Sequence, residues 1–204
     1  PIAAEIDRTH QYPAENVAKL FKLGVMGMTV PKEYGGMGAD QVAAAICTEE
    51  LAKACASTSD IVAGHTLCCV PIVEHGTEEQ KKKYLPMLTK GGVLGGMGIT
   101  EPNAGSDASK SQTEARLEGD HYVINGSKIF ITNGPEAGVF VIFAMTDKTK
   151  GNKGISAFIV DKDDPGFSIG KIEHKMGIRG SQTAELIFED VHLPADRLLG
   201  KENG

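Results

Sequence analysis

The sequence predicts two domains of different class: a helical domain over residues 1–90 and an antiparallel β-barrel or sandwich over residues 91–204. Up to Lys90, apolar residues recur at the spacing that is typical of helices. After Lys90, short apolar runs alternate with turn residues, a pattern typical of an all-β domain. The pair Gly91-Gly92 marks the boundary. With 204 residues and 41% hydrophobic content, the chain can bury a sizeable core.

In the helical domain, a helix is expected over Asn16–Leu23, whose apolar residues have helix spacing and which Gly24 ends. A loop rich in proline and glycine, residues 30–40, follows it. The last residue of that loop, Asp40, is expected to cap the N-terminus of a helix over Gln41–Ala54.

Two further helices complete the predicted helical domain. The small and soft side chains of Ile61–Val73 indicate close packing between helices. Thr77 and Gln80 have the spacing of a capping box, which begins a helix through KKKYLPML. The lysines at its start, Lys81–Lys83, indicate a solvated helix face rather than a phosphate-binding patch.

Hairpin signals and apolar runs predict the strands. Residues 117–135, LEGDHYVINGSKIFITNGP, hold two hairpin signals, at Glu118-Gly119-Asp120 and at Asn125-Gly126. Further strands are expected at four apolar segments, which are Val139–Met145, Ile155–Val160, Phe167–Ile169 and Glu185–Phe188.

Composition argues against several classes of protein. The net charge of −6 argues against nucleic acid as a partner, because binding to phosphate backbones requires a basic surface. The four cysteines form no C-x-x-C pair and are expected to be free thiols in a reducing compartment. The six histidines lack ligand-like spacing, so no metal site is expected. The sequence shows no apolar run long enough for a membrane span and no signal peptide, so neither is expected.

The loop TEPNAGSD, residues 100–107, is the first candidate site. The glycines before it do not form a dinucleotide fingerprint, because Glu101 stands where a third glycine is required. They are instead expected to let a strand approach another backbone or a planar ligand closely. The amides of Ala104, Gly105 and Ser106 are expected to be uncovered and to cradle an anionic oxygen such as a pyrophosphate. The alternative is a turn that bonds only to itself, which composition alone favours.

A second candidate site is FITNG, residues 130–134, at the end of a strand. Alternation places Phe130 and Thr132 on one face and Ile131 on the other. An aromatic ring beside a hydroxyl suits a planar heteroaromatic ligand, although an aromatic residue on a strand usually belongs to the core. Arg179 has two open interpretations: a contact with a phosphate or carboxylate, or an ion pair with another domain or at the surface.

In order and spacing, these segments resemble motifs of the acyl-CoA dehydrogenases, FAD enzymes that oxidise acyl-CoA thioesters to enoyl-CoA. The matching stretches are GITEPNAGSD, INGSKIFITNG, GNKGISAFIVDKDDPG, MGIRGSQTAELIFEDVHLP and, in the helical half, VPKEYGGMG. Two stretches, GNKGISAFIV and KMGIRGSQTAELIFEDV, are most similar to short-chain, butyryl-type members. The resemblance implies a helical N-terminal domain, a middle β-barrel and a C-terminal four-helix bundle. This chain would lack the usual first helix and the bundle, as expected of a piece of a longer protein.

The resemblance also implies which residues bind FAD and the CoA thioester. Thr100 would contact the pyrimidine edge of the flavin, Phe130 its ring face, and Thr132 the flavin N5, where hydride arrives. Ser106 and Asn152 would contact the CoA part of the substrate. The sequence departs from the family where Phe130 replaces a frequent Trp and Asn103 a more usual Gly. The full set implied to bind FAD is Met97, Gly98, Ile99, Thr100, Glu101, Pro102, Asn103, Ala104, Gly105, Ser106, Phe130, Ile131 and Thr132.

In butyryl-type members, a Glu of the C-terminal bundle removes the α proton of the substrate. Since no Glu of this sequence has that context, no catalytic residue is assigned, and the 204-residue chain alone is expected not to turn over acyl-CoA. The resemblance further implies an electron-transfer flavoprotein as redox partner, a homotetramer, and a location in the bacterial cytoplasm or the mitochondrial matrix. Two alternatives stay open: a relative with another flavin reaction, such as an acyl-CoA oxidase, and a non-catalytic β-barrel binding module.

Overall fold

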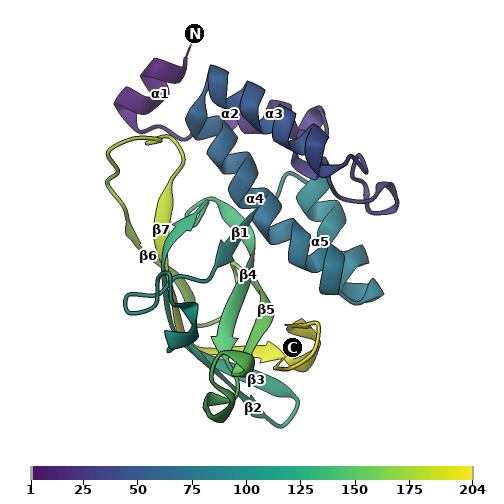
Figure 1. Ribbon diagram of the computed structural model, residues 1–204, viewed down its shortest axis with the longest axis vertical. Coiled ribbons are helices and arrows are strands. Elements are labelled where there is room, and N and C mark those ends of the chain that lie inside the picture. The colour runs from purple at the N-terminus through teal and green to yellow at the C-terminus, as the bar shows by residue number, and fades with distance from the viewer. Residues whose placement is uncertain (1, 204) are drawn as a thin grey trace.

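The computed structural model describes residues 2–203, so the outermost residues of the two expected domains, Pro1 and Gly204, lie outside the described part. Helices occupy the first part of the chain and strands the rest (Figure 1). The helices are α1 (Ala3–Thr9), α2 (Ala14–Lys22), α3 (Gln41–Ala54), α4 (Ala56–His75) and α5 (Glu78–Thr89). The strands are β1 (Leu94–Gly98), β2 (Glu114–Glu118), β3 (His121–Thr132), β4 (Ala137–Met145), β5 (Ile155–Asp161), β6 (Phe167–Ile172), β7 (Thr183–Pro194) and β8 (Leu198–Leu199).

Both predicted helix caps are present. The Asp40 side chain accepts a hydrogen bond from the amide of Ala43 (2.8 Å) and begins α3. Thr77 and Gln80 form the reciprocal capping box that begins α5, with the Thr77 hydroxyl accepting from the Gln80 amide and the Gln80 side chain accepting from the Thr77 amide. Local hydrogen bonding therefore sets both helix starts.

Helix α4 is the core of the helical half and lies against β1 (Figure 1). It is longer than the predicted segment, because its first turn is anchored by Ser59, whose hydroxyl donates to the Thr48 carbonyl of α3 (2.9 Å). Among residues 2–203, α4 is long and apolar enough to cross a membrane, yet 56% of that apolar stretch is buried inside the protein. Burial of this kind is typical of a core helix.

The strands form one mixed sheet in the order β6-β7-β3-β2-β4-β5-β8, with β1 paired to β4. Most pairs are antiparallel, as expected, but β4 has two parallel neighbours: β1, with Gly96 opposite Phe140, and β2, through Glu114 and Met145. The sheet curls so that its two ends share one core. Phe167 of β6 packs on Phe140 of β4, with ring centroids 5.1 Å apart. This common core supports the predicted barrel or sandwich, although the sheet is mixed rather than wholly antiparallel.

The hairpin predicted at Asn125-Gly126 is wrong. Both residues lie inside β3, where the register with β7 shifts between Ile124 and Gly126 and makes a bulge. Gly126 has a φ of 142°, and a Cβ there would lie 2.6 Å from the Thr113 hydroxyl oxygen, so glycine is needed for this packing. Pairing with β7 on both sides of the bulge keeps the strand continuous. The other predicted turn, at Glu118-Gly119-Asp120, joins β2 to β3 as expected.

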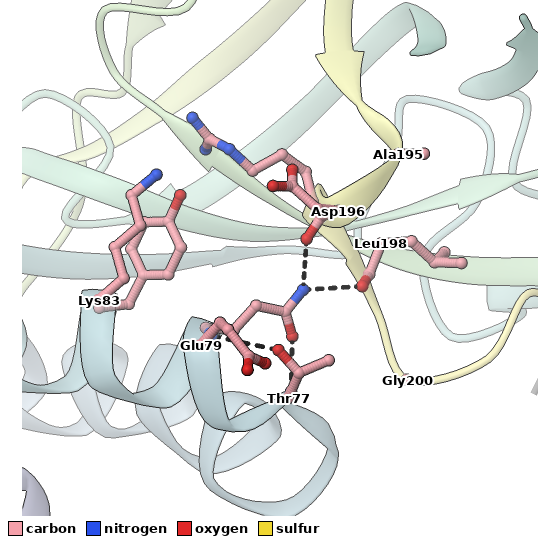
Figure 2. A pocket seen from close by; sticks show the side chains of 10 residues that line it. Thr77, Glu79, Lys83, Ala195, Asp196, Leu198 and Gly200 are labelled. Atoms are coloured by element: carbon pink, nitrogen blue, oxygen red, sulfur yellow. Dashed lines mark hydrogen bonds between the residues drawn. The ribbon is translucent and has the colours of Figure 1, made fainter. Parts of the chain in front are cut away.

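Helix α5 holds the end of the chain against the sheet (Figure 2). The Gln80 side-chain amide donates to the carbonyls of Asp196 (2.7 Å) and Leu198 (2.9 Å). Beside it, Arg197 pairs with Asp161 (2.7 Å). The surface groove at this junction contains none of the predicted site residues, and the charge of Arg197 is balanced within the protein. We therefore assign the junction a structural role.

Candidate functional site

The segment after β1 forms a compact loop, residues 99–113, which contains the first candidate motif. Its first turn is closed by paired backbone hydrogen bonds between Glu101 and Ala104, of 2.9 and 3.1 Å. The expectation of an uncovered amide is therefore wrong for Ala104, which is buried and bonded. It agrees with the structure at Gly105 and Ser106, which are exposed and whose amides donate to no group within residues 2–203. Pro102 and Asn103 lie at the exposed tip.

The carboxylate of Glu101 points into the protein and organises this loop. It pairs with the Lys128 ammonium of β3 at 2.6 Å, and the two side chains are 4% and 0% exposed. It also accepts hydrogen bonds from the Ser111 hydroxyl and from the amides of Gln112 and Thr113. Burial by itself raises the pKa of Glu101, but these donors outweigh it and lower the pKa to about 2. Glu101 therefore stays ionised, and its predicted contact with a cofactor stays a prediction.

Lys128 was missed by sequence reasoning. A lysine in NGSKIFITNG would normally be expected on a solvated strand face, yet the Lys128 side chain is fully buried. Burial lowers the pKa of its ammonium, and Glu101 compensates its charge. No local signal indicates this burial: in an ideal strand Lys128 would share a face with the exposed Phe130, and the register shift between Lys128 and Ile131 breaks that alternation.

Thr100 and the end of β3 lie side by side. The amide of Ile129 donates to the Thr100 carbonyl (2.8 Å), which brings the two candidate motifs together. The amide and hydroxyl of Thr100 donate to no group within residues 2–203, and neither does the hydroxyl of Thr132. These are donors that a ligand can use.

Phe130 is the exposed aromatic residue of this region. It is 59% exposed, whereas Ile131 is buried and Thr132 is half-buried, which agrees with the predicted alternation. Its φ of 59° lies in the left-handed region, which is unusual for a bulky residue, and it falls within a second register shift of β3. Conformations of this kind persist where the surrounding structure imposes them and are frequent at functional sites.

Asn133 supports the site from beneath and was also missed. Its side-chain amide donates to the carbonyls of Ile61 in α4 (3.0 Å) and Gly95 in β1 (3.1 Å), so it joins a helix and two strands. Within residues 2–203, its side-chain oxygen is buried and accepts no hydrogen bond. The signal in the sequence was an Asn-Gly pair directly after a strand.

Glycines let α4, β1 and β3 approach one another, as the sequence suggested for β1. A Cβ at Gly95 would lie 2.6 Å from the Cβ of Cys68, and one at Gly64 would lie 2.6 Å from the Thr132 methyl carbon. On the other side of β1, a Cβ at Gly98 would lie 3.2 Å from Lys128, while Met97 stays half-buried. The site therefore stands on tightly packed elements.

His65 of α4 fixes the start of β1. Its Nδ1 accepts a hydrogen bond from the Gly95 amide (2.9 Å), so the ring proton lies on Nε2, 3.5 Å from the Cys69 sulfur. Burial lowers the pKa of His65 to about 4. Of the four free cysteines, Cys68 and Cys69 are buried, with Cys69 beside this ring, and Cys47 and Cys55 are half-buried.

Asn152 lies apart from the Thr100 and Thr132 pair. It is exposed in the 3-10 segment Lys148–Gly154, in a groove with Phe143 and the C-terminal end of α4. That segment contacts the turn Ala108–Lys110, two residues after Ser106, so Asn152 and Ser106 belong to neighbouring loops. The Arg179 guanidinium donates to the carbonyls of Lys175 and Met176 in its own loop, so its contact with a ligand phosphate or carboxylate, or with another domain, stays a prediction.

The arrangement as a whole offers an exposed aromatic ring, unpartnered hydroxyls and unpartnered amides on adjacent loops. Space is open at Gly105, where a Cβ would meet nothing within 4 Å. Such a surface suits a planar polar ring with an anionic extension. Within residues 2–203, no cluster of His, Cys, Asp and Glu is suited to hold a metal ion.

Comparison with known proteins identifies the family. The model of the acyl-CoA dehydrogenase N-terminal domain matches residues 1–92, and that of the acyl-CoA dehydrogenase middle domain matches residues 96–191. Over 99% of its length, the chain is 59% identical to a short-chain specific acyl-CoA dehydrogenase of Clostridium acetobutylicum and 53% identical to an acryloyl-CoA reductase (NADH) of Anaerotignum propionicum.

Solved structures agree with this result. Butyryl-CoA dehydrogenase from Megasphaera elsdenii matches the whole chain with a TM-score of 0.96 and 47% identity. A chain in the structure of the electron-transferring flavoprotein of Acidaminococcus fermentans also matches all of it, with a TM-score of 0.96 and 50% identity. The chain spans about half the length of these proteins, 54% of the C. acetobutylicum enzyme and 52% of the reductase. It belongs to the acyl-CoA dehydrogenase family, whose N-terminal and middle domains it carries.

Proposed function

We propose that the protein containing this chain is an FAD-dependent acyl-CoA dehydrogenase that oxidises short-chain acyl-CoA thioesters at the α–β bond. The observation that carries the proposal is the junction of β1 and β3, where unpartnered donors of Thr100 and Thr132 lie beside the exposed ring of Phe130. The 59% identity to a short-chain specific enzyme supports the substrate class.

The residues of this junction fit a flavin. Thr100 would hold the pyrimidine edge, Thr132 would donate its hydroxyl toward the ring, and Phe130 would cover one face. The free amides of Gly105 and Ser106 would meet the pyrophosphate. When bound, the flavin supplies the acceptor for the hydride, while the protein orients the ring and excludes water. The other residues expected to bind the flavin would contribute by their positions along it: these are Met97, Gly98 and Ile99 at the end of β1, and Ile131 in β3.

The thioester is expected to lie between the flavin site and α4. Ser106 and Asn152, on neighbouring loops, would contact the CoA part. The outer face of α4 carries Ala63, Leu67 and Val70 at helix spacing, and Leu67 is 51% exposed, so this face can receive an acyl chain. The complete protein would be a homotetramer of the bacterial cytoplasm or the mitochondrial matrix and would pass electrons to an electron-transfer flavoprotein.

The catalytic base is expected outside this chain. Among the described carboxylates near the loop, Glu101 is already paired with Lys128 and is not free to take a proton from a substrate. We therefore expect the purified 204-residue chain to show no turnover of butyryl-CoA with an artificial electron acceptor. Steady turnover by this chain alone would contradict the assignment of the base.

A second candidate function is reduction of an enoyl-CoA at the same site. The 53% identity to an acryloyl-CoA reductase (NADH) favours it, because the same surface would serve both directions. An acyl-CoA oxidase would instead pass the electrons of the flavin to oxygen, and a non-catalytic binding module would bind neither flavin nor thioester.

Assays of the intact protein separate these functions. Purified protein is supplied with FAD, and its visible spectrum is followed on addition of butyryl-CoA. Bleaching of the flavin, with product formation that needs an electron-transfer flavoprotein and consumes no oxygen, is the expected result. Oxygen consumption would indicate an oxidase, and NADH-dependent loss of acryloyl-CoA a reductase. Protein that binds neither FAD nor thioester would refute the proposal.

A further inference from the structure

We infer that Glu101 and Lys128 are positioning residues: their buried ion pair sets the conformation in which the 99–113 loop presents its free donors to a flavin. The inference rests on the proposed function, since FAD is taken as the ligand of the loop. Neither side chain would touch the cofactor.

The first argument is where the pair ties the loop. Glu101 lies near the start of the loop, and its carboxylate accepts from Ser111, Gln112 and Thr113 at the end. Lys128 adds contacts to the Ile99 carbonyl and the Ser111 hydroxyl, both 3.3 Å long, and it projects from β3, which is paired on both sides. One carboxylate and one ammonium therefore join both ends of the loop to the strand that carries Phe130 and Thr132.

The second argument is that the segment between these ends has only local hydrogen bonds. Residues 102–110 are held by the Glu101–Ala104 turn, by Lys110 to Asp107, and by the Ser109 hydroxyl to Asp107. Within residues 2–203, no hydrogen bond joins this segment to the sheet. Apart from buried Ala104 and the packing of Ala108–Lys110 on Lys148–Gly154, its position relative to Thr132 therefore depends on the anchored ends.

The third argument is electrostatic. Glu101 and Lys128 are almost fully buried, so removal of one charge leaves the other without compensation. The loop would then have to open so that the remaining group reaches water. Opening moves Gly105 and Ser106, although neither was changed.

The test uses the intact protein freed of flavin, with the variants Lys128→Met, Glu101→Gln and the double variant Glu101→Gln/Lys128→Met. The control is Arg197→Gln, which removes a partly buried ion pair with Asp161, away from the loop. Two quantities are measured: the dissociation constant of FAD, from flavin fluorescence, and the amide hydrogen exchange of residues 102–110 in the flavin-free protein.

We expect Lys128→Met to weaken FAD binding by about ten- to a hundredfold, the range of one lost charge-assisted hydrogen bond, and to speed exchange in the loop. The double variant should recover part of the FAD affinity and part of the protection from exchange. It leaves no unpaired charge, and the glutamine oxygen can still accept from the amides of Gln112 and Thr113. Arg197→Gln should lower thermal stability and leave both quantities unchanged. Where Lys128→Met does not fold, Glu101→Gln decides the question by the same two quantities.

Unchanged FAD affinity and unchanged exchange in the single variants would overturn the inference, and so would equal effects in Arg197→Gln. Failure of the proposed function looks different: wild-type protein would bind no FAD, while the exchange measurement would still report whether the pair holds the loop.

Discussion

Acidification should destabilise this protein through His65 over a defined pH range. The ring is 0% exposed, and its pKa is lowered from 6.5 to about 4. The unfolded chain therefore takes up a proton as the pH falls below 6.5, whereas the folded protein resists until about pH 4. Stability is complete above the unfolded pKa and declines between these values. Protonation of Nδ1 would also remove the acceptor of the Gly95 amide and loosen the start of β1.

The size of the effect follows from the difference between the two pKa values. The shift from 6.5 to about 4 corresponds to about 3 kcal/mol when complete, and to about 2 kcal/mol near pH 5. Glu101 does not interfere, because its pKa of about 2 places its loss of stability below about pH 4.5.

The assay is urea unfolding of wild-type protein and of His65→Gln at several pH values between about 7.5 and 5, followed by circular dichroism. The variant should be less stable at neutral pH but should lose less stability on acidification. If the free energy of unfolding of the wild-type protein does not change with pH over this range, or changes equally in His65→Gln, the buried imidazole does not resist protonation.

Three further predictions concern packing. Gly64→Ala would normally stabilise a helix, but its Cβ would lie 2.6 Å from the Thr132 methyl carbon, so we expect a net loss of about 1–3 kcal/mol in chemical denaturation; a gain in stability would contradict the packing. Phe130→Gly should be more stable than Phe130→Ala by about 1 kcal/mol, because glycine accepts the left-handed conformation, and equal melting curves would argue against that strain. Arg197→Gln should cost about 2 kcal/mol in thermal or urea unfolding, because the half-buried Asp161 loses a charged partner; an unchanged midpoint would mean that solvent already screens this pair.

Where the decisive interactions span three or four residues, the sequence alone determined the structure. Asp40 and the pair Thr77 and Gln80 satisfy the free amides of helix starts with their own side chains, so no distant segment was needed to predict them. At the end of β3, the exposed Phe130 and buried Ile131 match the expected alternation, but the register shift against β7 contributes to this arrangement.

Tertiary structure decided what depends on partners far away in the chain. Asn125-Gly126 carries the dipeptide of a hairpin, yet pairing with β7 keeps it within a strand. Lys128 lies 27 residues from Glu101, and no local pattern shows that two opposite charges so far apart will be buried together. The free energy of such a contact is the balance between the cost of desolvating two charges and the gain from pairing them in the folded protein, so it leaves no period in the sequence. The sequence motifs predicted the loop and the strand that form the candidate site, and only the fold revealed the ion pair that joins them.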